Sequence, residues 1–438
     1  MTVAVSTPAL HDALADLVGR PHVLRDPVTR SRSVVDGVMP GAVVRPGRVE
    51  EVSRVLVLCA SERLAVVPRG AGTTQDLGNP PRRLDLVLDL GRLTAVREYV
   101  PEDMVATVET GLTLGGLGAH LAPHRQMLAL DPPGGAARSV GGVLATHASG
   151  PLRFRYGTGR DLLLGARFVQ ADGTITWGGA KVVKSVTGYD VPKLLVGSLG
   201  TLGVLVEATL RLHPMPPATR SWQVALPSAG TARAFLAALL DCPLQPDRAA
   251  LLDTTGLRRA GLAPNPFALL LSIGSVAEAV EEQGRALEAL AGTHGGRATG
   301  IVDAVWSGLG AAVDAPIRLR LAGEPRRLLD WIAEAQAAAG RLGAEAGLLA
   351  QPGHGVIQMA VWGSHEPRRV GGELVEPLRA AVEAEGGSLV VERAPADLKS
   401  VCDAWGNIIP EILTIMKRIK TEFDPHNCLS PGRFVGGL

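Results

Sequence analysis

The segment from Pro68 to Thr74 has residue types suited to holding a pyrophosphate. It reads Pro-Arg-Gly-Ala-Gly-Thr-Thr and follows a short apolar run, 64–67, typical of a buried strand. Its glycines allow positive φ angles and close backbone approach, so that N–H groups can bind phosphate oxygens without a metal. Thr73 and Thr74 add hydroxyl donors. An ordinary glycine turn would look the same, so this loop alone does not identify a site.

Two familiar phosphate-binding sequences do not fit the loop. A Rossmann Gly-x-Gly-x-x-Gly pattern would place its third glycine at Gln75, and the chain has no Walker A sequence. Further glycine-rich stretches follow, however. They are Asp-Pro-Pro-Gly-Gly at 131–135, Ser-Val-Gly-Gly-Val at 139–143, Thr-His-Ala-Ser-Gly at 146–150, Tyr-Gly at 156–157 and Gly-Ser-Leu-Gly-Thr-Leu-Gly-Val at 197–204. Several such turns beside predicted strands indicate backbone wrapped around one large, flat ligand.

The elements that would position these loops follow from hydrophobic spacing. Apolar residues three and four apart predict a helix over 49–60, and alternation predicts strands over 84–90, 105–109 and 202–212. Asp172-Gly173 predicts a hairpin turn within 166–176. The proline-rich stretch 214–217 is a natural linker. Beyond it we expect helices over 231–240, 276–291, 326–342 and 408–420 and strands over 268–273 and 356–362, an α+β pattern.

Composition excludes several classes of protein. The 438 residues carry a net charge of +1, so nothing attracts the chain generally to nucleic acid or anionic lipid. There is no apolar run of membrane-spanning length, and residues 1–19 do not resemble a signal peptide. The four cysteines lie far apart, so neither an iron–sulfur cluster nor a structural zinc is expected, and we expect free thiols in the cytoplasm.

These loops resemble the FAD-binding domain of the vanillyl-alcohol oxidase (PCMH-type) flavoprotein superfamily. The resemblance covers about residues 41–214 and the tail Phe-Asp-Pro…Ser-Pro-Gly-Arg at 423–433. Within the superfamily the chain most resembles the glycolate oxidase FAD-binding subunit of the E type. The segments that carry this likeness are Val-Thr-Gly-Tyr-Asp-Val-Pro-Lys-Leu at 186–194, Val-Val-Glu-Arg-Ala-Pro at 390–395 and Met-Lys-Arg-Ile-Lys at 416–420.

The resemblance implies an α+β fold. It consists of a PCMH-type FAD-binding domain of two α+β subdomains, with an α+β cap domain built on an antiparallel sheet. We expect an N-terminal segment at 1–36, the FAD-binding domain at 37–214, the cap at 218–400 and a tail at 401–438 that returns to the FAD-binding domain.

The implied cofactor is FAD, bound non-covalently. Many members of the superfamily tether FAD through a histidine at the position that Thr73 occupies here, and others through a cysteine that 131–135 lacks. The residues expected to bind FAD are Pro68, Arg69, Gly70, Ala71, Gly72, Thr73, Thr74, Pro133, Gly134, Ser139, Gly142, Thr146, Ala148, Gly150, Tyr156, Gly200, Gly203, Val204 and Arg433.

Oxidation of a 2-hydroxy acid needs an arginine for the carboxylate and a base for the hydroxyl proton. His354 and Arg393 are the candidates from the cap; the alternative for Arg393 is a structural ion pair, and for His354 an ordinary loop histidine. The catalytic D-type relatives carry His-x-Gly-Asp-Gly-Asn-x-His, which helps to hold a metal. The nearest segment here, 352–356, has one histidine and no acid, so no metal site is expected and an accessory E-type role is favoured.

The resemblance also implies partners. We expect the FAD-binding subunit of a glycolate or D-lactate oxidase or dehydrogenase complex, with a catalytic D-type flavin subunit and a separate iron–sulfur subunit that receives the electrons. The complex would be cytoplasmic and at most peripheral to the inner face of the cell membrane. The alternatives are a self-sufficient FAD-dependent alcohol or hydroxy-acid dehydrogenase and a non-catalytic scaffold with the FAD fold. A nucleic-acid-binding role has no support, because the chain has few aromatic residues and no basic stripe.

Overall fold

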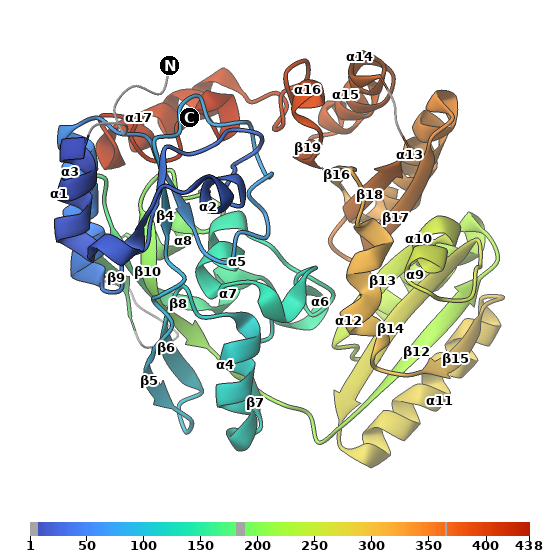
Figure 1. The fold of residues 1–438 in the computed structure, drawn as a ribbon. Helices are drawn as coiled ribbons and strands as arrows, with labels where there is room; N and C mark the ends of the chain where they lie inside the picture. Colours follow the sequence, from blue (N-terminus) through green and yellow to red (C-terminus); the bar gives the residue numbers. More distant parts are fainter. Residues whose placement is uncertain (1–7, 181–188, 364–365) are drawn as a thin grey trace. The chain divides into compact units, whose positions relative to one another are not determined.

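The computed structural model describes residues 8–180, 189–363 and 366–438 (Figure 1). The chain forms two compact units. The first comprises Met1–Ser149, Thr158–Pro214 and Ile408–Leu438, and the second comprises Gly150–Gly157 and Met215–Asn407. Residues 186–188, which open one of the segments that carry the family resemblance, lie outside the described residues.

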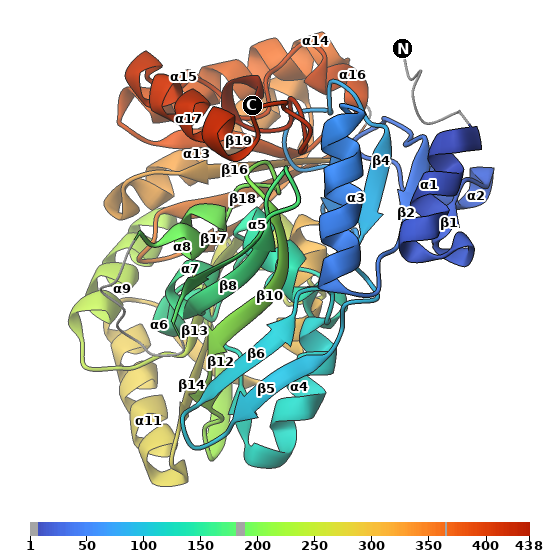
Figure 2. The ribbon, with the colours of Figure 1, turned by 90° about the vertical axis from the view of Figure 1, so that its left-hand side faces the viewer.

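One sheet of the first unit has the strand order β1-β2-β4-β3, and β2, β4 and β3 run parallel. Helix α3 begins at Val49 and buries Val52, Val55 and Leu56 against this sheet, as its apolar spacing predicts. Helix α1 adds Leu10 and Leu14 to the same core, and both helices lie on one side of the sheet (Figure 2). The elements are α1 (Pro8–Val18), β1 (Val23–Leu24), α2 (Pro27–Ser31), β2 (Ala42–Val44), α3 (Val49–Ser61), β3 (Val66–Arg69) and β4 (Leu86–Asp89).

The second sheet of this unit is antiparallel, in the order β5-β6-β10-β8-β9. The predicted strands and the hairpin at Asp172-Gly173 are confirmed, and Gly173 has a φ of +87°. Helices α4, α5 and α17 contribute to its core. The elements are β5 (Val96–Val100), β6 (Val105–Glu109), α4 (Leu114–Leu121), β7 (Gln126–Met127), α5 (Val140–Thr146), α7 (Gly159–Leu162), β8 (Leu163–Val169), β9 (Ile175–Gly179), α8 (Val191–Leu195), β10 (Val204–Arg211), β11 (His213–Pro214) and α17 (Pro410–Phe423).

The second unit is built on one antiparallel sheet in the order β15-β12-β14-β13-β17-β18-β16-β19. Helices α9, α11, α13 and α15 supply the main core on one face, while α10 and the 3₁₀ turn at 309–313 help to form a smaller core on the other. The strands are β12 (Ala218–Leu226), β13 (Arg248–Asp253), β14 (Phe267–Ser275), β15 (Arg297–Ile301), β16 (Ile317–Ala322), β17 (Glu345–Gln351), β18 (Val356–Trp362) and β19 (Ser388–Arg393). The helices are α6 (Arg153–Tyr156), α9 (Ala229–Asp241), α10 (Thr254–Arg259), α11 (Ala277–Thr293), α12 (Val305–Gly308), α13 (Leu328–Leu342), α14 (Pro367–Arg369), α15 (Glu376–Ala384) and α16 (Ala396–Lys399).

The units divide the chain differently from the expected domains in three places. Residues 8–18, placed in a separate N-terminal segment, pack into the core of the first unit. Gly150–Gly157 groups with the second unit, where Phe154 packs against the main core. Residues 401–407, assigned to the tail, also group with the second unit, because the Arg379 guanidinium donates a 2.7 Å hydrogen bond to the Asp403 carbonyl.

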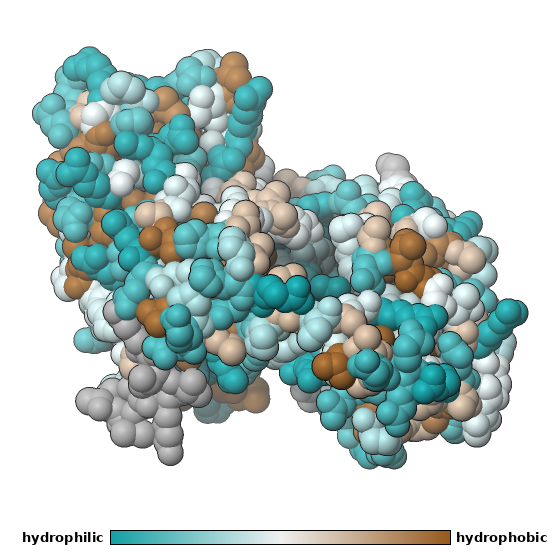
Figure 3. Space-filling view, turned by 90° about the horizontal axis from the view of Figure 1, so that it is seen from below, coloured by the Kyte–Doolittle hydropathy of each residue, from teal (hydrophilic) through white to brown (hydrophobic). Residues whose placement is uncertain are grey.

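No helix in the described ranges is both long and apolar enough to cross a bilayer. The face seen in Figure 3 intersperses hydrophilic and hydrophobic residues.

Two glycines of α11 give a matched test of the core of the second unit. A Cβ at Gly284 would lie 2.6 Å from Cζ2 of the fully buried Trp222, whereas a Cβ at Gly292 would meet nothing within 4 Å. We expect Gly284→Ala to lower the free energy of unfolding by about 1–3 kcal/mol through overpacking. Gly292→Ala should leave it unchanged or raise it by up to about 1 kcal/mol through helix propensity. Urea unfolding measures the free energy of unfolding of both variants. Equal changes in the two variants would contradict this packing of Gly284 against Trp222.

Candidate functional site

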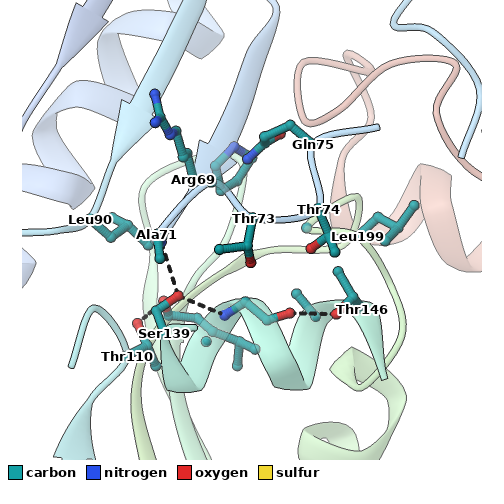
Figure 4. Close-up of a pocket in the computed structure, with 18 of the residues that line it drawn as sticks. Arg69, Ala71, Thr73, Thr74, Gln75, Leu90, Thr110, Ser139, Thr146 and Leu199 are labelled. Atoms are coloured by element: carbon teal, nitrogen blue, oxygen red, sulfur yellow. Dashed lines mark hydrogen bonds between the residues drawn. The ribbon is translucent and has the colours of Figure 1, made fainter. Parts of the chain in front are cut away.

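Three glycine-rich loops of the first unit surround one pocket (Figure 4). The first follows β3, the second leads into α5 and the third precedes β10. The pocket has an empty volume of about 730 Å³, a figure that includes the open solvent at its mouth. Its lining residues are Pro68, Arg69, Gly70, Ala71, Gly72, Thr73, Thr74, Gln75, Leu90, Thr110, Ser139, Gly141, Gly142, Ala145, Thr146, Ser198, Leu199, Gly200, Gly203, Leu205 and Arg433.

The first loop can take its path only with glycine at two positions. Gly72 has a φ of +73°, and a Cβ there would lie 2.5 Å from Nε of Arg69. A Cβ at Gly70 would collide with the Ser139 hydroxyl. Gly70 therefore lies against the second loop and Gly72 against Arg69 of its own loop, which leaves no space for a side chain at either position.

Ser139 joins the first two loops. Its hydroxyl oxygen accepts hydrogen bonds from the backbone N–H of Ala71, at 3.2 Å, and from that of Gly142, at 3.3 Å. The second bond caps α5 at its first turn. Figure 4 shows Thr73 and Thr74 facing this helix, while the Arg69 side chain points away from it.

A buried arginine lies behind the same two loops. The Arg138 guanidinium donates to Thr146 Oγ1 at 3.1 Å and, more weakly, to Thr74 Oγ1 at 3.4 Å. Arg138 is only 5 % exposed. It therefore links the end of the first loop to the end of α5 and brings a positive charge close to the pocket.

The third loop has two left-handed residues in succession. Leu199 has a φ of +52° and Gly200 one of +69°, and a Cβ on Gly200 would lie 3.0 Å from the Pro68 ring. The Ser430 hydroxyl donates to the Leu199 carbonyl at 3.0 Å. The loop is thus fixed both by β3 and by the C-terminal tail.

The tail reaches the pocket through two buried cations. One Nη of Arg433 donates to the carbonyls of Gln75 and Leu77, both at 2.7 Å. The Lys420 ammonium donates to the Thr201 carbonyl at 2.8 Å and to the Asp424 carboxylate at 2.6 Å. Burial lowers the pKa of Arg433 to about 10, and burial also lowers the pKa of Lys420, which Asp424 partly offsets.

The pocket fits a dinucleotide with negatively charged phosphates. None of its described lining residues is acidic, and Arg69 and Arg433 are basic. The tight glycine turns, which would collide with a Cβ, allow backbone N–H groups to approach a ligand directly. The residues present are therefore those that non-covalent FAD requires.

The structure brings most of the predicted FAD-binding residues together. Those that line the pocket are Pro68, Arg69, Gly70, Ala71, Gly72, Thr73, Thr74, Ser139, Gly142, Thr146, Gly200, Gly203 and Arg433. Their contact with FAD stays a prediction. Pro133, Gly134, Ala148 and Val204 are not among the lining residues, and Val204 is buried in a core.

Gly150 and Tyr156 are not among the lining residues and group with the second unit, so their contact with FAD stays a prediction. There the Tyr156 hydroxyl donates to Asp247 at 3.3 Å, and Arg155 donates to the same carboxylate at 3.0 Å. Burial raises the pKa of Tyr156 and that of Asp247. These side chains fasten α6 to the start of β13, which accounts for a tyrosine at this position without a cofactor.

Sequence reasoning missed several lining residues. They are Gln75, Leu90, Thr110, Gly141, Ala145, Ser198, Leu199 and Leu205. Gly141, Ser198 and Leu199 lie inside motifs that were recognised, so taking each loop whole would have found them. Thr110 could not be found, because it reaches the pocket only through pairing: the Gly141 N–H donates to its carbonyl, and its hydroxyl donates to the Leu205 carbonyl.

The two predicted catalytic residues do not come together. His354 lies in the turn before Val356. Val356 pairs with Ala322, which in turn pairs with Ser388, so His354 lies near the start of β19. Arg393 lies at the other end of β19 and donates to Asp314 at 2.9 Å. They are thus separated by most of a strand, too far to act on one small molecule.

His354 has the features of a half-buried structural histidine. Its ring lies edge-on to Phe154, with centroids 6.4 Å apart. Burial and the nearby Arg153 lower the pKa of His354, which keeps the ring neutral. When the segment is aligned on Gly353 and Gly355, the two histidines of the D-type motif correspond to Gln351 and Gln358, which would make weak metal ligands.

Comparison with known proteins identifies the first unit's chemistry. Residues 40–179 match a family described as FAD binding domain. The chain also has the fold of p-cresol methylhydroxylase, with a TM-score of 0.79 at 17% identity, covering 97% of this chain and 95% of that one. The expected PCMH-type FAD-binding fold is thereby confirmed.

Relatives by sequence are named as hydroxy-acid enzymes. The chain is 27% identical to glycolate oxidase subunit GlcD of Bacillus subtilis over 90% of this chain and 89% of the relative. It is 31% identical to the mitochondrial D-lactate dehydrogenase (cytochrome) of Arabidopsis thaliana over 59% of this chain. The match spans 46% of the latter, less than half its length. The assignment to the E type in particular stays a prediction.

The glycine turn of the first loop can be tested by charge. We expect Gly72→Asp to abolish retention of FAD, because Asp strains a φ of +73° and puts an anion beside the phosphates. Gly118→Asp is the control, since that exposed glycine of α4 has nothing within 4 Å of its would-be Cβ. The measurement is the flavin-to-protein absorbance ratio after gel filtration. A full complement of FAD in the Gly72 variant would contradict the assignment of this loop.

Proposed function

We propose that this chain, a flavoprotein with the FAD-binding fold of the vanillyl-alcohol oxidase superfamily, uses FAD to oxidise a small 2-hydroxy acid. The observation that carries the proposal is the acid-free glycine pocket of the first unit, in a chain that matches a glycolate oxidase subunit over 90% of its length. The relatives named for glycolate and D-lactate support these two acids as substrates.

When bound, FAD supplies the acceptor for a hydride from the substrate carbon. The residues of the chain would provide binding and position. The backbone of residues 70–74 would hold the pyrophosphate, with Thr73 and Thr74 as added donors. Ser139 and Arg138 would keep the first loop and α5 at a fixed spacing through their hydrogen bonds to Ala71, Thr74 and Thr146.

We infer that electrons leave through a separate iron–sulfur subunit of a complex. The four cysteines do not provide a cluster site, because Cys59, Cys402 and Cys428 are buried and Cys242 is half-buried, each as a free thiol. Burial raises the pKa of Cys59 and raises that of Cys402 to about 11, which disfavours the thiolates that a cluster needs.

A second candidate is an accessory role beside a catalytic D-type flavin subunit. Gln351 and Gln358 at the positions of the metal-binding histidines favour it. In that case this chain would bind FAD without oxidising the acid itself.

Anaerobic absorbance spectra of the FAD-loaded chain distinguish the two candidates. We expect the flavin bands to bleach when glycolate or D-lactate is added, because each has the hydroxyl-bearing carbon that donates the hydride. A dye acceptor should then restore them. Acetate is the control: it has the carboxylate but no hydroxyl, and it should leave the spectrum unchanged. Flavin bands that persist with both hydroxy acids would contradict oxidation by this chain.

A further inference from the structure

Part of the second unit's sheet has an unusual concentration of arginine. The residues of β16 alternate, with Ile317, Leu319 and Leu321 in the main hydrophobic core. Arg318 and Arg320 therefore lie on the opposite face. On that face α10 and the 3₁₀ turn at 309–313 pack against β13, β17 and β18, further along the sheet.

The two arginines share a single acid. Arg318 Nε donates to one oxygen of Glu392 and Arg320 Nε to the other, both at 3.0 Å. The Arg318 and Glu392 side chains are each 13% exposed, and that of Arg320 is 36% exposed. One carboxylate neutralises one guanidinium, so the trio has a net charge of +1.

Each guanidinium still has donors to offer. Among the described residues neither arginine donates any other hydrogen bond, so the Nη amino groups of both stay available. A regular strand places residues two apart at roughly 6–7 Å, a spacing that a small anion can bridge. Glu392 holds both guanidinium groups in place, which reduces the side-chain entropy lost on binding.

The neighbours on this face complete a small polar site. Gln358 pairs directly with Arg320 across β18 and β16, and Gln351 lies two residues diagonally away on β17. Gln351 is only 6% exposed, and its Oε1 is buried with no hydrogen-bond partner in the described part of the chain. This oxygen is an acceptor, so its missing partner is a donor, which the hydroxyl of a 2-hydroxy acid supplies and a carboxylate does not. Val390, Ala360 and Ala322 supply short apolar walls.

We propose that Arg318 and Arg320, positioned by Glu392, bind the carboxylate of a small aliphatic acid on this face, with Gln358 beside it. The proposal rests on the proposed function in identifying that acid as the 2-hydroxy acid substrate. Planar guanidinium groups match the two oxygens of a carboxylate. Glu392 takes only one Nε donor from each arginine, which leaves their Nη groups for a ligand. Arg393 is less suited, because its charge is balanced by the carboxylate of Asp314, whereas Arg318 and Arg320 share one carboxylate. Arg318 and Arg320 are thus assigned to substrate binding in its place.

Binding of oxalate to the full-length, FAD-loaded chain tests the assignment without redox chemistry. Oxalate has the length of glycolate but no hydrogen to transfer, so calorimetry reports binding whether or not the flavin is ever reduced. Failure of hydroxy acids to bleach the flavin would count against the proposed function and leave this measurement intact. We expect Arg320→Met to raise the dissociation constant at least about ten-fold, and Arg320→Lys to have an intermediate effect, since lysine keeps the charge but loses the fork.

Arg326→Met is the matched control, because it removes the same charge from a side chain that is 80% exposed in the same unit. The dissociation constant of oxalate for this variant should stay within about two-fold of the value for the parent chain, as expected for a screened surface charge. Circular dichroism melting confirms that each variant is folded. Absence of oxalate binding to the parent chain, or equal binding by Arg320→Met, would overturn the proposal. Inorganic phosphate that binds as tightly as oxalate through Arg320 would overturn the assignment to carboxylates.

Discussion

The geometry of the pocket depends on two buried cations in the last nineteen residues of the chain. Lys420 and Arg433 are 5% and 4% exposed, and burying a charge without partners is costly. Backbone carbonyls accept hydrogen bonds from both: Thr201 and Leu429 from the lysine, which also pairs with Asp424, and Gln75 and Leu77 from the arginine. Thr201 lies in the third loop, and Gln75 and Leu77 follow the first loop. The tail therefore fixes these two loops in one arrangement. The pocket is therefore complete only when the C-terminal tail is in place.

Within that arrangement glycine and serine act as spacers. Gly70 and Gly200 bring the backbone against Ser139 and Pro68, and Ser139 joins the loops by two hydrogen bonds. The second unit uses a different principle, a regular sheet whose alternation separates an apolar core from polar side chains. A loop pocket suits an elongated cofactor that needs many backbone donors, whereas a rigid sheet face suits a small acid that needs a few fixed charges.

Local patterns could predict the elements and the loops, and the resemblance to a flavoprotein superfamily implied the cofactor. Alternation identified β6 and β10, and i, i+3, i+4 spacing identified α3, because these signals lie within one element. Long-range pairing could not be predicted. Thr110 lines the pocket because it is hydrogen-bonded to Leu205 and Gly141. Tyr156 is instead hydrogen-bonded to Asp247 in the second unit. Likewise His354 and Arg393 are plausible by residue type, yet strand register places them apart. Arg318 and Arg320 are positioned by Glu392, which lies 74 and 72 residues further along the chain.

The affinity of the Arg433→Met variant for FAD tests the central claim most directly. The substitution removes the donors to Gln75 and Leu77 but leaves every lining glycine in place. Since a hydrogen bond from a charged group contributes about 1.5–3 kcal/mol, we predict at least a ten-fold higher dissociation constant, measured by flavin fluorescence quenching. Arg418→Met, on the exposed side of α17, should bind FAD as the parent chain does. If the Arg433 variant is folded and binds FAD with unchanged affinity, the tail does not shape the pocket and the account is wrong.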